Sequence, residues 1–428
     1  MTPETAGRRR AVVLVGGPAA PYSRGLRIAR ALDSGGYDVE IAAITAEGIP
    51  DEERDGPITI RRYRPTGRHA RAELPVSRDH SGEPPPMPVR VVRHQLRRLQ
   101  RWILWPYPVR GWWATLAAQL APADIYHACG SLAIAPAIAA RERDRRAGRV
   151  SHVVYDAVDD VGSGNNVLRF PRAVRALIRR RERSWARAAD ARITVNDTLA
   201  ERLASAWATP PPLTVPNWPE GPPRPGTHAN PIREALRLPA GCRIVLFQGR
   251  LGPHRGLDEA AEAVLQVPNA VLVLLGFGSG YAASAARDAD PIYAGRHFTL
   301  PAVHPDELLA WTAAADVALV TLPPVSANQR ASTPNKFWEA IAAGTPIVLG
   351  PDLPVMAELV RAFDLGEIAE RLTPESVAIA IRQLVDVPRE VADARRRRIA
   401  AVGAERFSWP AAAERYLAMV YDLTSASG

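Results

Sequence analysis

The segment from Ser332 to Val348 concentrates residues suited to binding an anion. Lys336 is the only lysine among 54 Lys and Arg residues, and a chain that otherwise uses arginine retains lysine where a compact ammonium is required. Pro334 before it and Gly344 after it predict a short helix. Free backbone amides at a helix start, with a lysine one turn in, suit a phosphate. The alternatives are chance placement of one lysine and an ordinary surface ion pair with Glu339, three residues on.

A second group of cations lies in the loop Gly249–Gly256. Its small residues let the backbone approach a ligand, and Arg250 and Arg255 could make forked contacts with phosphate oxygens. With Lys336 they place three cations in loops at the carboxyl ends of the strands of one sheet, which suits a diphosphate without a metal. Gly276 ends the next apolar run and could bring backbone to the same ligand, or could serve only a tight turn.

The elements that must position these residues follow a repeated pattern. In the first half of the chain, short β-branched runs alternate with amphipathic stretches, which predicts a parallel sheet covered by helices. The expected strands are Ala11–Gly17, Asp38–Ile44, Ile58–Tyr63, Asp124–Ala128, His152–Asp156 and Arg192–Asn196, and the expected helices are Ser23–Ser34, Leu132–Arg143 and Val167–Ala189.

The pattern restarts after a proline-rich stretch, Pro210–Pro231, which breaks all periodicity. Two doubly wound units place a ligand cleft between them, beyond the carboxyl ends of their strands. We expect domains at 1–216 and 243–404, a linker at 217–242, and a helix at 405–428 that packs back toward the first domain. The expected strands are Arg243–Gln248, Ala270–Gly276, His297–Leu300, Asp316–Thr321 and Pro346–Leu349, and the expected helices are Gly256–Gln266, Pro305–Ala314, Pro334–Ala343 and Pro374–Val385.

The region from 65 to 111 departs from this alternation. Arginines interleave with apolar residues between Arg90 and Ile103, and an aromatic cluster follows up to Trp113. This basic amphipathic pattern is typical of a helix that lies on an anionic membrane surface. It is equally typical of a helix with a solvated arginine face, so peripheral membrane contact through 90–113 stays open.

Taken in order, the motifs resemble a known family. From about Arg243 to the end, the chain is similar to the nucleotide-sugar-binding half of GT-B glycosyltransferases, in particular the retaining family-four-like group and its Pro-Asn-Lys subgroup. The first half is similar more loosely. The resemblance implies an α/β fold of two doubly wound, Rossmann-like domains facing a central cleft. The segments that carry it are Gly249–Leu251, Arg255–Leu257, Leu275–Gly278 and Pro334–Pro346, with Asp124–His127, Tyr155–Ala157, Ile193–Asn196 and Val215–Asn217 in the first half.

The resemblance also implies roles for particular residues. Arg250 and Arg255 would neutralise the diphosphate of the donor, and Arg250, Lys336 and His127 are the catalytic candidates. Glu339 matches the second carboxylate of the family's Glu-x7-Glu pattern and would accept hydrogen bonds from the ribose. The further donor-binding candidates are the glycine loop of Gly16 and Gly17, Gly276, and Asn335 at the phosphate or sugar end.

Two positions depart from the family pattern. Ala331 stands eight residues before Glu339, so the first carboxylate of the pair is absent, and with it the expected recognition of the donor sugar hydroxyls. The family's His-x-His is here His127-Ala128-Cys129, so Cys129 could replace the histidine that faces the sugar. His127 could also be a buried histidine bonded to backbone.

Composition narrows the class of protein. With 428 residues, 47% hydrophobic and 23% charged, the chain can bury two cores, and its longest apolar run is too short to span a bilayer. Two distant cysteines, Cys129 and Cys242, favour the reducing cytoplasm, with the inner face of the membrane as an alternative. The net charge of +9 suggests nucleic acid, but few aromatics interleave with the arginines, so we expect none.

We therefore expect a metal-independent glycosyltransferase that needs no cofactor beyond its nucleotide-sugar donor. No Asp-x-Asp element stands where a metal would be held, and Asp159-Asp160 reads as a loop feature. A GT-B protein that lost turnover and acts as a binding or scaffolding partner is the main alternative. A dehydrogenase is disfavoured because Gly16-Gly17-Pro18 does not continue as Gly-x-Gly-x-x-Gly. The acceptor could be a lipid-linked sugar, a polysaccharide or a small metabolite.

Overall fold

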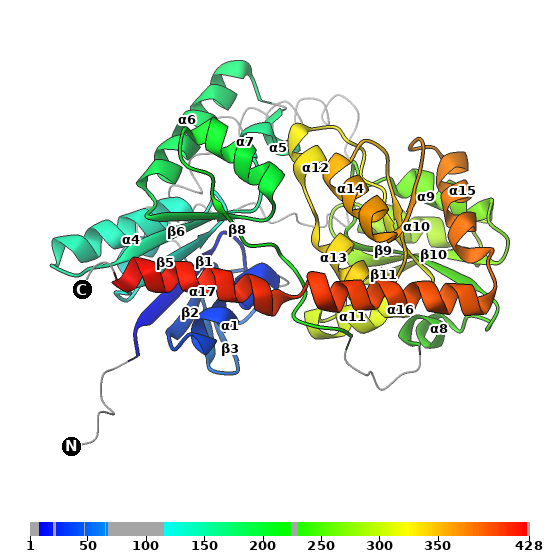
Figure 1. Cartoon of the computed structure of the whole chain (residues 1–428), viewed down its shortest axis with the longest axis horizontal. Coiled ribbons are helices and arrows are strands. Elements are labelled where there is room, and N and C mark those ends of the chain that lie inside the picture. The colour runs from blue at the N-terminus through cyan, green and yellow to red at the C-terminus, as the bar shows by residue number, and fades with distance from the viewer. Residues whose placement is uncertain are drawn as a thin grey trace.

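The computed structural model describes residues 8–19, 23–46, 48–64, 66, 115–168, 170–223 and 230–425. They form two α/β units that lie side by side (Figure 1). The first sheet runs in the order β3 (Glu52–Asp55), β4 (Ile58–Tyr63), β2 (Asp38–Ile44), β1 (Arg10–Val15), β5 (Ile125–Cys129), β6 (His152–Ala157), β7 (Ala191–Thr194) and β8 (Leu213–Thr214). The second runs in the order β11 (His297–Pro301), β10 (Ala270–Phe277), β9 (Arg243–Arg250), β12 (Val317–Val320), β13 (Ile347–Leu349) and β14 (Gly366–Ile368).

The central strands of both sheets are buried on both faces, whereas the edge strands β3, β8 and β14 are partly exposed. All neighbouring strands pair in parallel except β3 with β4. In β1, Val12 and Leu14 face one hydrophobic cluster while Val13 and Val15 face another. Such continuous apolar runs are what a parallel sheet covered by helices requires. The two doubly wound units confirm the fold class expected from the sequence.

Helices cover the first sheet on both sides. They are α1 (Ser23–Ser34), α4 (Ile134–Arg146), α5 (Asn165–Leu168), α6 (Arg172–Ala188) and α7 (Asp197–Trp207), with a 3-10 turn, η2 (Val161–Ser163). The second unit carries α8 (Pro231–Leu236), α9 (Leu257–Leu265), α10 (Tyr281–Asp288), α11 (Pro305–Ala313), α12 (Ala327–Ala331), α13 (Asn335–Ala342), α14 (Pro354–Phe363), α15 (Pro374–Val385) and α16 (Arg389–Arg406). The last helix, α17 (Trp409–Ser425), packs with α1 on the first sheet.

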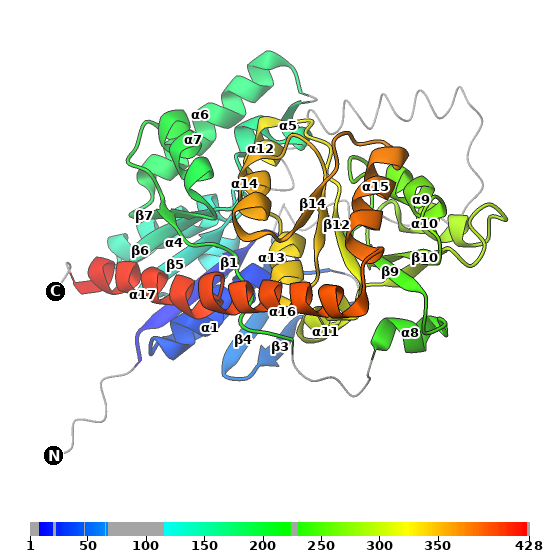
Figure 2. The ribbon, with the colours of Figure 1, turned by 45° about the vertical axis from the view of Figure 1, so that its right-hand side comes forward.

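The chain crosses between the units at two places that pack together. α16 lies on the second unit and α17 on the first, and the two helices follow one another end to end (Figure 2). Trp218, in the segment that leaves β8, packs against Trp338 of α13 and Phe407 at the end of α16, with ring centroids 6.1 and 5.8 Å away. The Trp409 N–H donates to the carbonyl of Pro219 at 2.9 Å. The junction is therefore an aromatic cluster.

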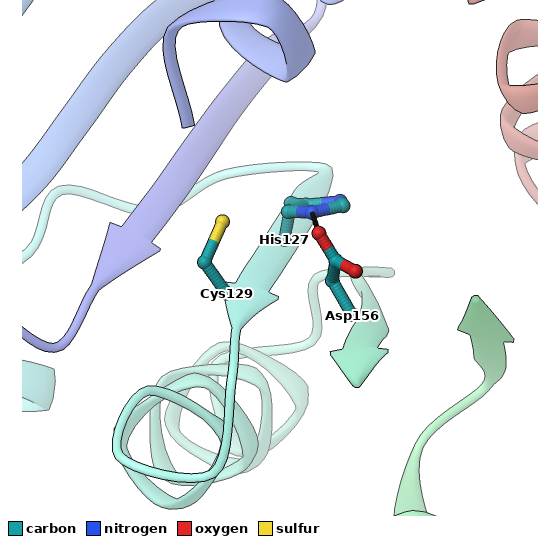
Figure 3. A group of neighbouring side chains, drawn as sticks. All are labelled: His127, Cys129 and Asp156. Carbon is teal, nitrogen blue, oxygen red and sulfur yellow. Dashed lines mark hydrogen bonds and ion pairs between the residues drawn. The ribbon is translucent and has the colours of Figure 1, made fainter. Parts of the chain in front are cut away.

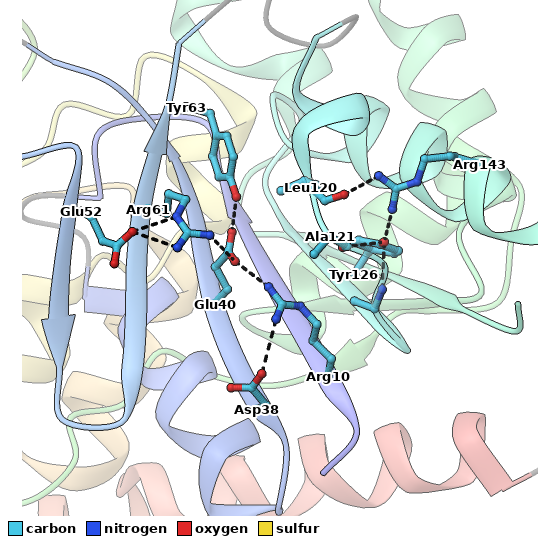
Figure 4. Close-up of polar contacts among 11 residues, drawn as sticks. Arg10, Asp38, Glu40, Glu52, Arg61, Tyr63, Leu120, Ala121, Tyr126 and Arg143 are labelled. Atoms are coloured by element: carbon cyan, nitrogen blue, oxygen red, sulfur yellow. Dashed lines mark hydrogen bonds and ion pairs between the residues drawn. The ribbon is translucent and has the colours of Figure 1, made fainter. Parts of the chain in front are cut away.

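A buried carboxylate ties the first strands of the chain together (Figure 4). Glu40 of β2 accepts hydrogen bonds from Arg10 of β1 at 2.7 Å and from the Tyr63 hydroxyl of β4 at 2.5 Å. Arg61 approaches the same carboxylate to 3.5 Å and also bonds Glu52 of β3. Burial and the adjacent Glu40 raise the pKa of Tyr63 to about 12. These pairs supply the partners that a carboxylate in a sheet interior needs.

The expected elements agree closely with the observed ones, with one informative difference. The helix expected over Val167–Ala189 is broken into α5 and α6. Pro171 lies at the break, immediately before α6. Proline has no backbone N–H to donate and is tolerated in a helix only at its start, so the helix stops before Pro171 and a new one begins after it. Within 217–242, α8 packs on the second unit. The helix and aromatic cluster expected at 90–113 lie outside the described residues. No helix in the described ranges is long and apolar enough to cross a membrane.

Candidate functional site

A cavity of about 480 Å³ lies between the two units, at the carboxyl ends of their strands. Its first-unit wall comes from the loop after β1, from the start of the turn that leads into α4, and from the segment after β6. Its second-unit wall comes from the ends of β9 and β10. The lining residues are Val15, Gly16, Gly17, Pro18, Ala19, Cys129, Gly130, Ser131, Leu132, Tyr155, Ala157, Val158, Asp159, Val161, Arg250 and Phe277.

The glycine loop after β1 lines the cavity as the sequence predicted. Gly16 packs so closely on Leu132 that a side chain at this position would overlap that of Leu132. The Gly17 carbonyl accepts a hydrogen bond from the Ile44 N–H of the neighbouring strand at 2.9 Å. The backbone of this loop therefore forms one wall of the cavity, and Gly16 has no side chain that would collide with Leu132.

Arg250 forms the opposite wall together with Phe277. Its guanidinium carbon lies 5.7 Å from the centroid of the Phe277 ring, a cation–π arrangement that orients the planar fork. Gly276 does not line the cavity. A side chain on Gly276 would overlap the backbone of Gly249 on the neighbouring strand. The structure thus shows a packing role for Gly276 between β9 and β10, and its contact with a donor stays a prediction.

The three expected cations lie near one another, but of them only Arg250 lines the cavity; Arg255 and Lys336, like Glu339, lie outside its lining. The positive charge of Arg250 acts on the pKa of Arg255, and the positive charge of Arg255 in turn acts on the pKa of Lys336. Burial and the adjacent Arg250 lower the pKa of Arg255, and Asp159 opposes that shift. Like charges repel each other most where water is excluded, so this group is strained in the absence of an anion.

Lys336 is the most strained member of the group. Its ammonium nitrogen is buried and, among the described residues, has no hydrogen-bond partner. It lies 3.3 Å from the centroid of the Phe247 ring, and its chain passes Gly249, where a side chain would touch it. Burial, reinforced by Arg255 and only partly offset by Glu339, lowers the pKa of Lys336 well below its usual value. A buried lysine nitrogen with no hydrogen-bond partner among the described residues indicates a position for an anion, which would restore its protonated form.

Glu339 is buried one turn along α13. The side-chain amide of Gln248 donates to its Oε2 at 2.7 Å, and the Gln248 carbonyl oxygen accepts from the Thr312 hydroxyl at 2.6 Å. Burial raises the pKa of Glu339, and the charge of Arg27 on α1 opposes that shift. The second carboxylate oxygen receives no hydrogen bond from the described residues, so one acceptor remains for a ligand. Lys336 and Glu339 do not form the surface ion pair considered as an alternative.

Asn335 joins the two units and does not line the cavity. Its amide donates to the Ser23 hydroxyl at the start of α1 at 3.2 Å, and its carbonyl oxygen accepts from Asn217. Asn217 in turn accepts from Arg27 at 2.8 Å. Asn335 therefore makes a bond across the interdomain junction, and its role in donor binding stays a prediction.

His127 is fully buried and does not line the cavity, whereas Cys129, two residues on, does; Figure 3 shows both side chains with Asp156. Its Nε2 lies 3.4 Å from Asp156 Oδ2, and its Nδ1 lies 2.9 Å from the Tyr416 hydroxyl of α17. Burial lowers the pKa of His127, which favours the neutral ring. Since a carboxylate can only accept, the proton resides on Nε2 and Tyr416 donates to Nδ1. Of the two alternatives for His127, the geometry favours the buried one, bonded to side chains and not to backbone, because both nitrogens are engaged outside the cavity.

Asp156 is the centre of this buried network. Arg24 donates to both of its carboxylate oxygens, at 2.6 and 2.9 Å, and also to the Val215 carbonyl at 3.0 Å. Burial opposes ionisation, but Arg24 and His127 outweigh it and hold the pKa of Asp156 below its usual value. Cys129 completes a set whose ligand atoms lie within 4.8 Å of one another. The bonds from Arg24 and His127 account for this cluster without an ion.

One carboxylate of the cavity carried no functional signal in the sequence analysis. Asp159, in the segment after β6, lines the cavity, and its Oδ1 accepts from the Asn328 amide of α12 at 2.8 Å. The Asn328 carbonyl oxygen accepts from the backbone N–H of Asp160 at 2.7 Å. Two aspartates after a parallel strand were the available signal, but the sequence could not show that Asn328 lies 169 positions away and beside them.

Comparisons with known proteins identify a family for part of the second unit. Residues 242–386 match the family described as Glycosyl transferases group 1. A search of curated proteins finds no match. The matched range contains Arg250, Arg255, Lys336 and Glu339.

Solved structures match almost the whole chain. Sucrose-phosphate synthase from Thermosynechococcus elongatus superposes with a TM-score of 0.63 at 17% identity, covering 98% of this chain and 100% of that one. The Anabaena protein HepE, in complex with UDP and glucose, gives 0.64 at 14% identity, covering 97% and 100%. An α,α-trehalose-phosphate synthase from Burkholderia xenovorans, in complex with glucose-6-phosphate, gives 0.62 at 14%, covering 97% and 99%. The chain therefore has the GT-B fold, and its second unit is similar to the glycosyl transferases group 1 family.

Proposed function

We propose that this protein is a glycosyltransferase that moves a sugar from a nucleotide-diphosphate donor to a hydroxyl acceptor. The observation that carries the proposal is the buried, unpartnered ammonium of Lys336 beside Arg255, in the unit that matches glycosyl transferases group 1. The HepE structure was solved with UDP and glucose. A diphosphate would supply the negative charge that the three cations lack.

The same cations would promote bond cleavage. When the bond between the sugar and the diphosphate breaks, negative charge grows on the leaving phosphate. Arg250, Arg255, Lys336 and the amides at the start of α13 are positioned before the reaction, so they stabilise that charge at little reorganisation cost. α13 has no side-chain cap at its N-terminus, and the Phe337 N–H donates to the Pro334 carbonyl at 2.9 Å. The amides of Asn335 and Lys336 are therefore the ones that a ligand could use. On this basis we propose that no metal is needed.

The stereochemical course is inferred from the resemblance to retaining enzymes. The acceptor oxygen would attack the face that the leaving phosphate departs from, and the phosphate would take the acceptor proton. His127 would hold Asp156 and α17 in place without touching the substrate. The acceptor stays open among a lipid-linked sugar, a polysaccharide and a small metabolite, and peripheral membrane contact through 90–113 remains a proposal.

A binding protein with the same fold is the second candidate. The absence of a carboxylate at position 331 and the sequestration of His127 both favour it, because each removes a group expected at the sugar. It would bind a nucleotide sugar without breaking it.

Thermal shift against UDP-, GDP-, ADP- and dTDP-sugars tests the proposal, with Lys336→Ala as the variant. We expect one donor series to raise the melting temperature of the wild type and not of Lys336→Ala. No stabilisation by any of the four would overturn donor binding. Release of free nucleoside diphosphate from the bound donor, measured with and without candidate acceptors, then separates the enzyme from the binding protein.

A further inference from the structure

We infer that Asp159 binds a hydroxyl of the donor sugar, and so replaces from the first unit the carboxylate that position 331 lacks. The inference rests on the proposed function. It concerns the sugar-recognising end of the site, whereas the three cations concern the diphosphate end.

The first step is the position of the Asp159 carboxylate. Asp159 belongs to the cavity wall that also includes Gly17 and, across the cleft, Arg250. Its side chain is exposed to the cavity. Asp160, the next residue, is directed away from it and accepts from Ser163 and Arg202 within the first unit. Of these adjacent aspartates, Asp159 alone is presented to a ligand.

The second step is the way in which the carboxylate is held. The Asn328 amide donates to Oδ1, and the Asn328 carbonyl accepts from the backbone beside it, so a single side chain fixes both the loop and the carboxylate. Among the described residues, Asn328 is the only hydrogen-bond partner of this carboxylate. One oxygen is thereby pinned and the other keeps its full capacity to accept. Asn328 lies on α12, the helix that ends at Ala331.

The Asp159 carboxylate also lies near the cations that would bind the diphosphate. The charge of Arg255 acts on Asp159 and also on Lys336. The group next to a bound diphosphate is the sugar attached to it. Burial and the neighbouring Asp160 raise the pKa of Asp159, and Asn328 and Arg255 oppose that rise. A sugar offers hydroxyl donors, and the ionised form of this carboxyl group, with one free oxygen, accepts from them strongly. A phosphate in the same place would be repelled, which excludes the diphosphate itself as the partner of Asp159.

The substitution Asp159→Asn separates these effects. Asparagine can still accept from Asn328 through its carbonyl oxygen, so the loop stays in place while the charge is removed. We expect the affinity for the nucleotide sugar to fall at least about tenfold, as for the loss of a charge-assisted hydrogen bond. We expect the affinity for the nucleoside diphosphate alone to stay the same or rise, because a negative charge near the phosphates has gone.

Calorimetric titration would use matched pairs of UDP with UDP-glucose, GDP with GDP-mannose, ADP with ADP-glucose, and dTDP with dTDP-glucose. Glu262→Gln, an exposed carboxylate on α9, is the control and should change neither affinity. A donor deoxygenated at the contacted hydroxyl should bind wild type and Asp159→Asn equally well.

An unchanged ratio of nucleotide-sugar to diphosphate affinity in Asp159→Asn would overturn the inference. Asn328→Ala provides a second test, since it keeps the Asp159 charge but removes the hydrogen bond that holds the carboxylate. It should weaken binding of the nucleotide sugar and not of the diphosphate, and by a smaller factor than Asp159→Asn does. If the wild type binds none of the four diphosphates, the proposed function fails, and that outcome is distinct from failure of the role of Asp159.

Discussion

Replacing Lys336 with methionine should change stability and ligand binding in opposite directions. The Lys336 side-chain nitrogen is buried and has no hydrogen-bond partner in the part of the chain that the structure describes, and a buried unsatisfied polar group costs about 1–3 kcal/mol. Its approach to the Phe247 ring returns part of this cost, but methionine keeps an attractive contact with the same ring. We therefore expect Lys336→Met to unfold with about 1–2 kcal/mol more free energy at neutral pH. That corresponds to a rise of roughly 2–6 °C in Tm.

The difference should depend on pH in a defined direction. The pKa of Lys336 is lowered in the folded protein, so between that value and the unfolded value near 10.5 the unfolded chain binds more protons. Wild-type stability then rises with pH, by at most about 1.4 kcal/mol per pH unit from this residue. Lys336→Met lacks this contribution, so its advantage should be larger at pH 6 than at pH 9. Thermal or urea unfolding at the two pH values measures it.

The same substitution, Lys336→Met, should weaken ligand binding although it stabilises the fold. Lys336→Met should bind the nucleoside diphosphate about 10- to 100-fold more weakly, as expected for the loss of a hydrogen bond to a charged group. In the wild type, the diphosphate restores the lowered pKa of Lys336, so binding should take up a proton. Titration calorimetry in buffers of different ionisation enthalpy detects this uptake, and it should be absent in the variant. Arg389→Met, at a side chain 89% exposed, is the matched control. A variant that is less stable than the wild type, or that keeps its diphosphate affinity, would refute the reasoning.

Three further changes test the framework of the site. Arg24→Met should cost about 3–5 kcal/mol, because it leaves the buried Asp156 charge without its partner, and adding Asp156→Asn should recover part of the loss in urea unfolding. Burial raises the pKa of Glu182 to about 8, so its contribution to stability is lost as pH rises from about 4.5 through 8; Glu182→Gln should flatten this loss, measured as Tm at pH 6 and pH 9. Gly256→Ala should cost several kcal/mol, since Gly256 has a φ of +68° and a side chain there would overlap the Thr321 carbonyl, which a melting curve would show.

Each of these changes has a control or a contrary outcome. Simple additivity of Arg24→Met and Asp156→Asn would mean that the pair is not coupled. Parallel pH profiles for wild type and Glu182→Gln would contradict the raised pKa. Gly295 has a φ of +69° and open space around it, so Gly295→Ala introduces the same backbone strain without an overlap. Equal losses at positions 256 and 295 would assign the effect to backbone strain alone.

The elements, and the proximity of the three cations, could be predicted because their signals are local; the role of the cations stays a prediction. Strands buried on both faces appear as short continuous apolar runs, and β1, β9 and β10 were expected at nearly their observed bounds. Arg250 and Lys336 each lie within a few residues of a strand end or a helix start. The chemistry of such positions depends on nearby backbone, which the sequence specifies directly. The break at Pro171 was missed because the amphipathic pattern continues through it.

The buried network around His127 could not be predicted in the same way. Arg24 is 132 positions from Asp156, and Tyr416 is 289 positions from His127. Each contact requires that α1, β6 and α17 already be packed on one sheet. The sequence left a buried histidine as one alternative, and the expected backbone partner proved to be two side chains. Periodicity identifies which face of an element is buried, but not which polar residue meets it there.

The residues that could be predicted lie at the proposed diphosphate end of the cleft, and Asp159, which could not be predicted, lies at the proposed sugar end. A diphosphate can be bound by one unit, since strand ends and a helix start of a single sheet supply cations and amides. Under the proposed function, recognition of the sugar beyond that diphosphate would need groups from the facing unit, and Asn328 of the second unit holds Asp159 of the first. The carboxylate that α12 lacks at position 331 would then be replaced from the segment after β6, without any trace in the local motif. The residues that select the sugar should therefore be sought across the interdomain contacts, where the position of each depends on how the two units dock.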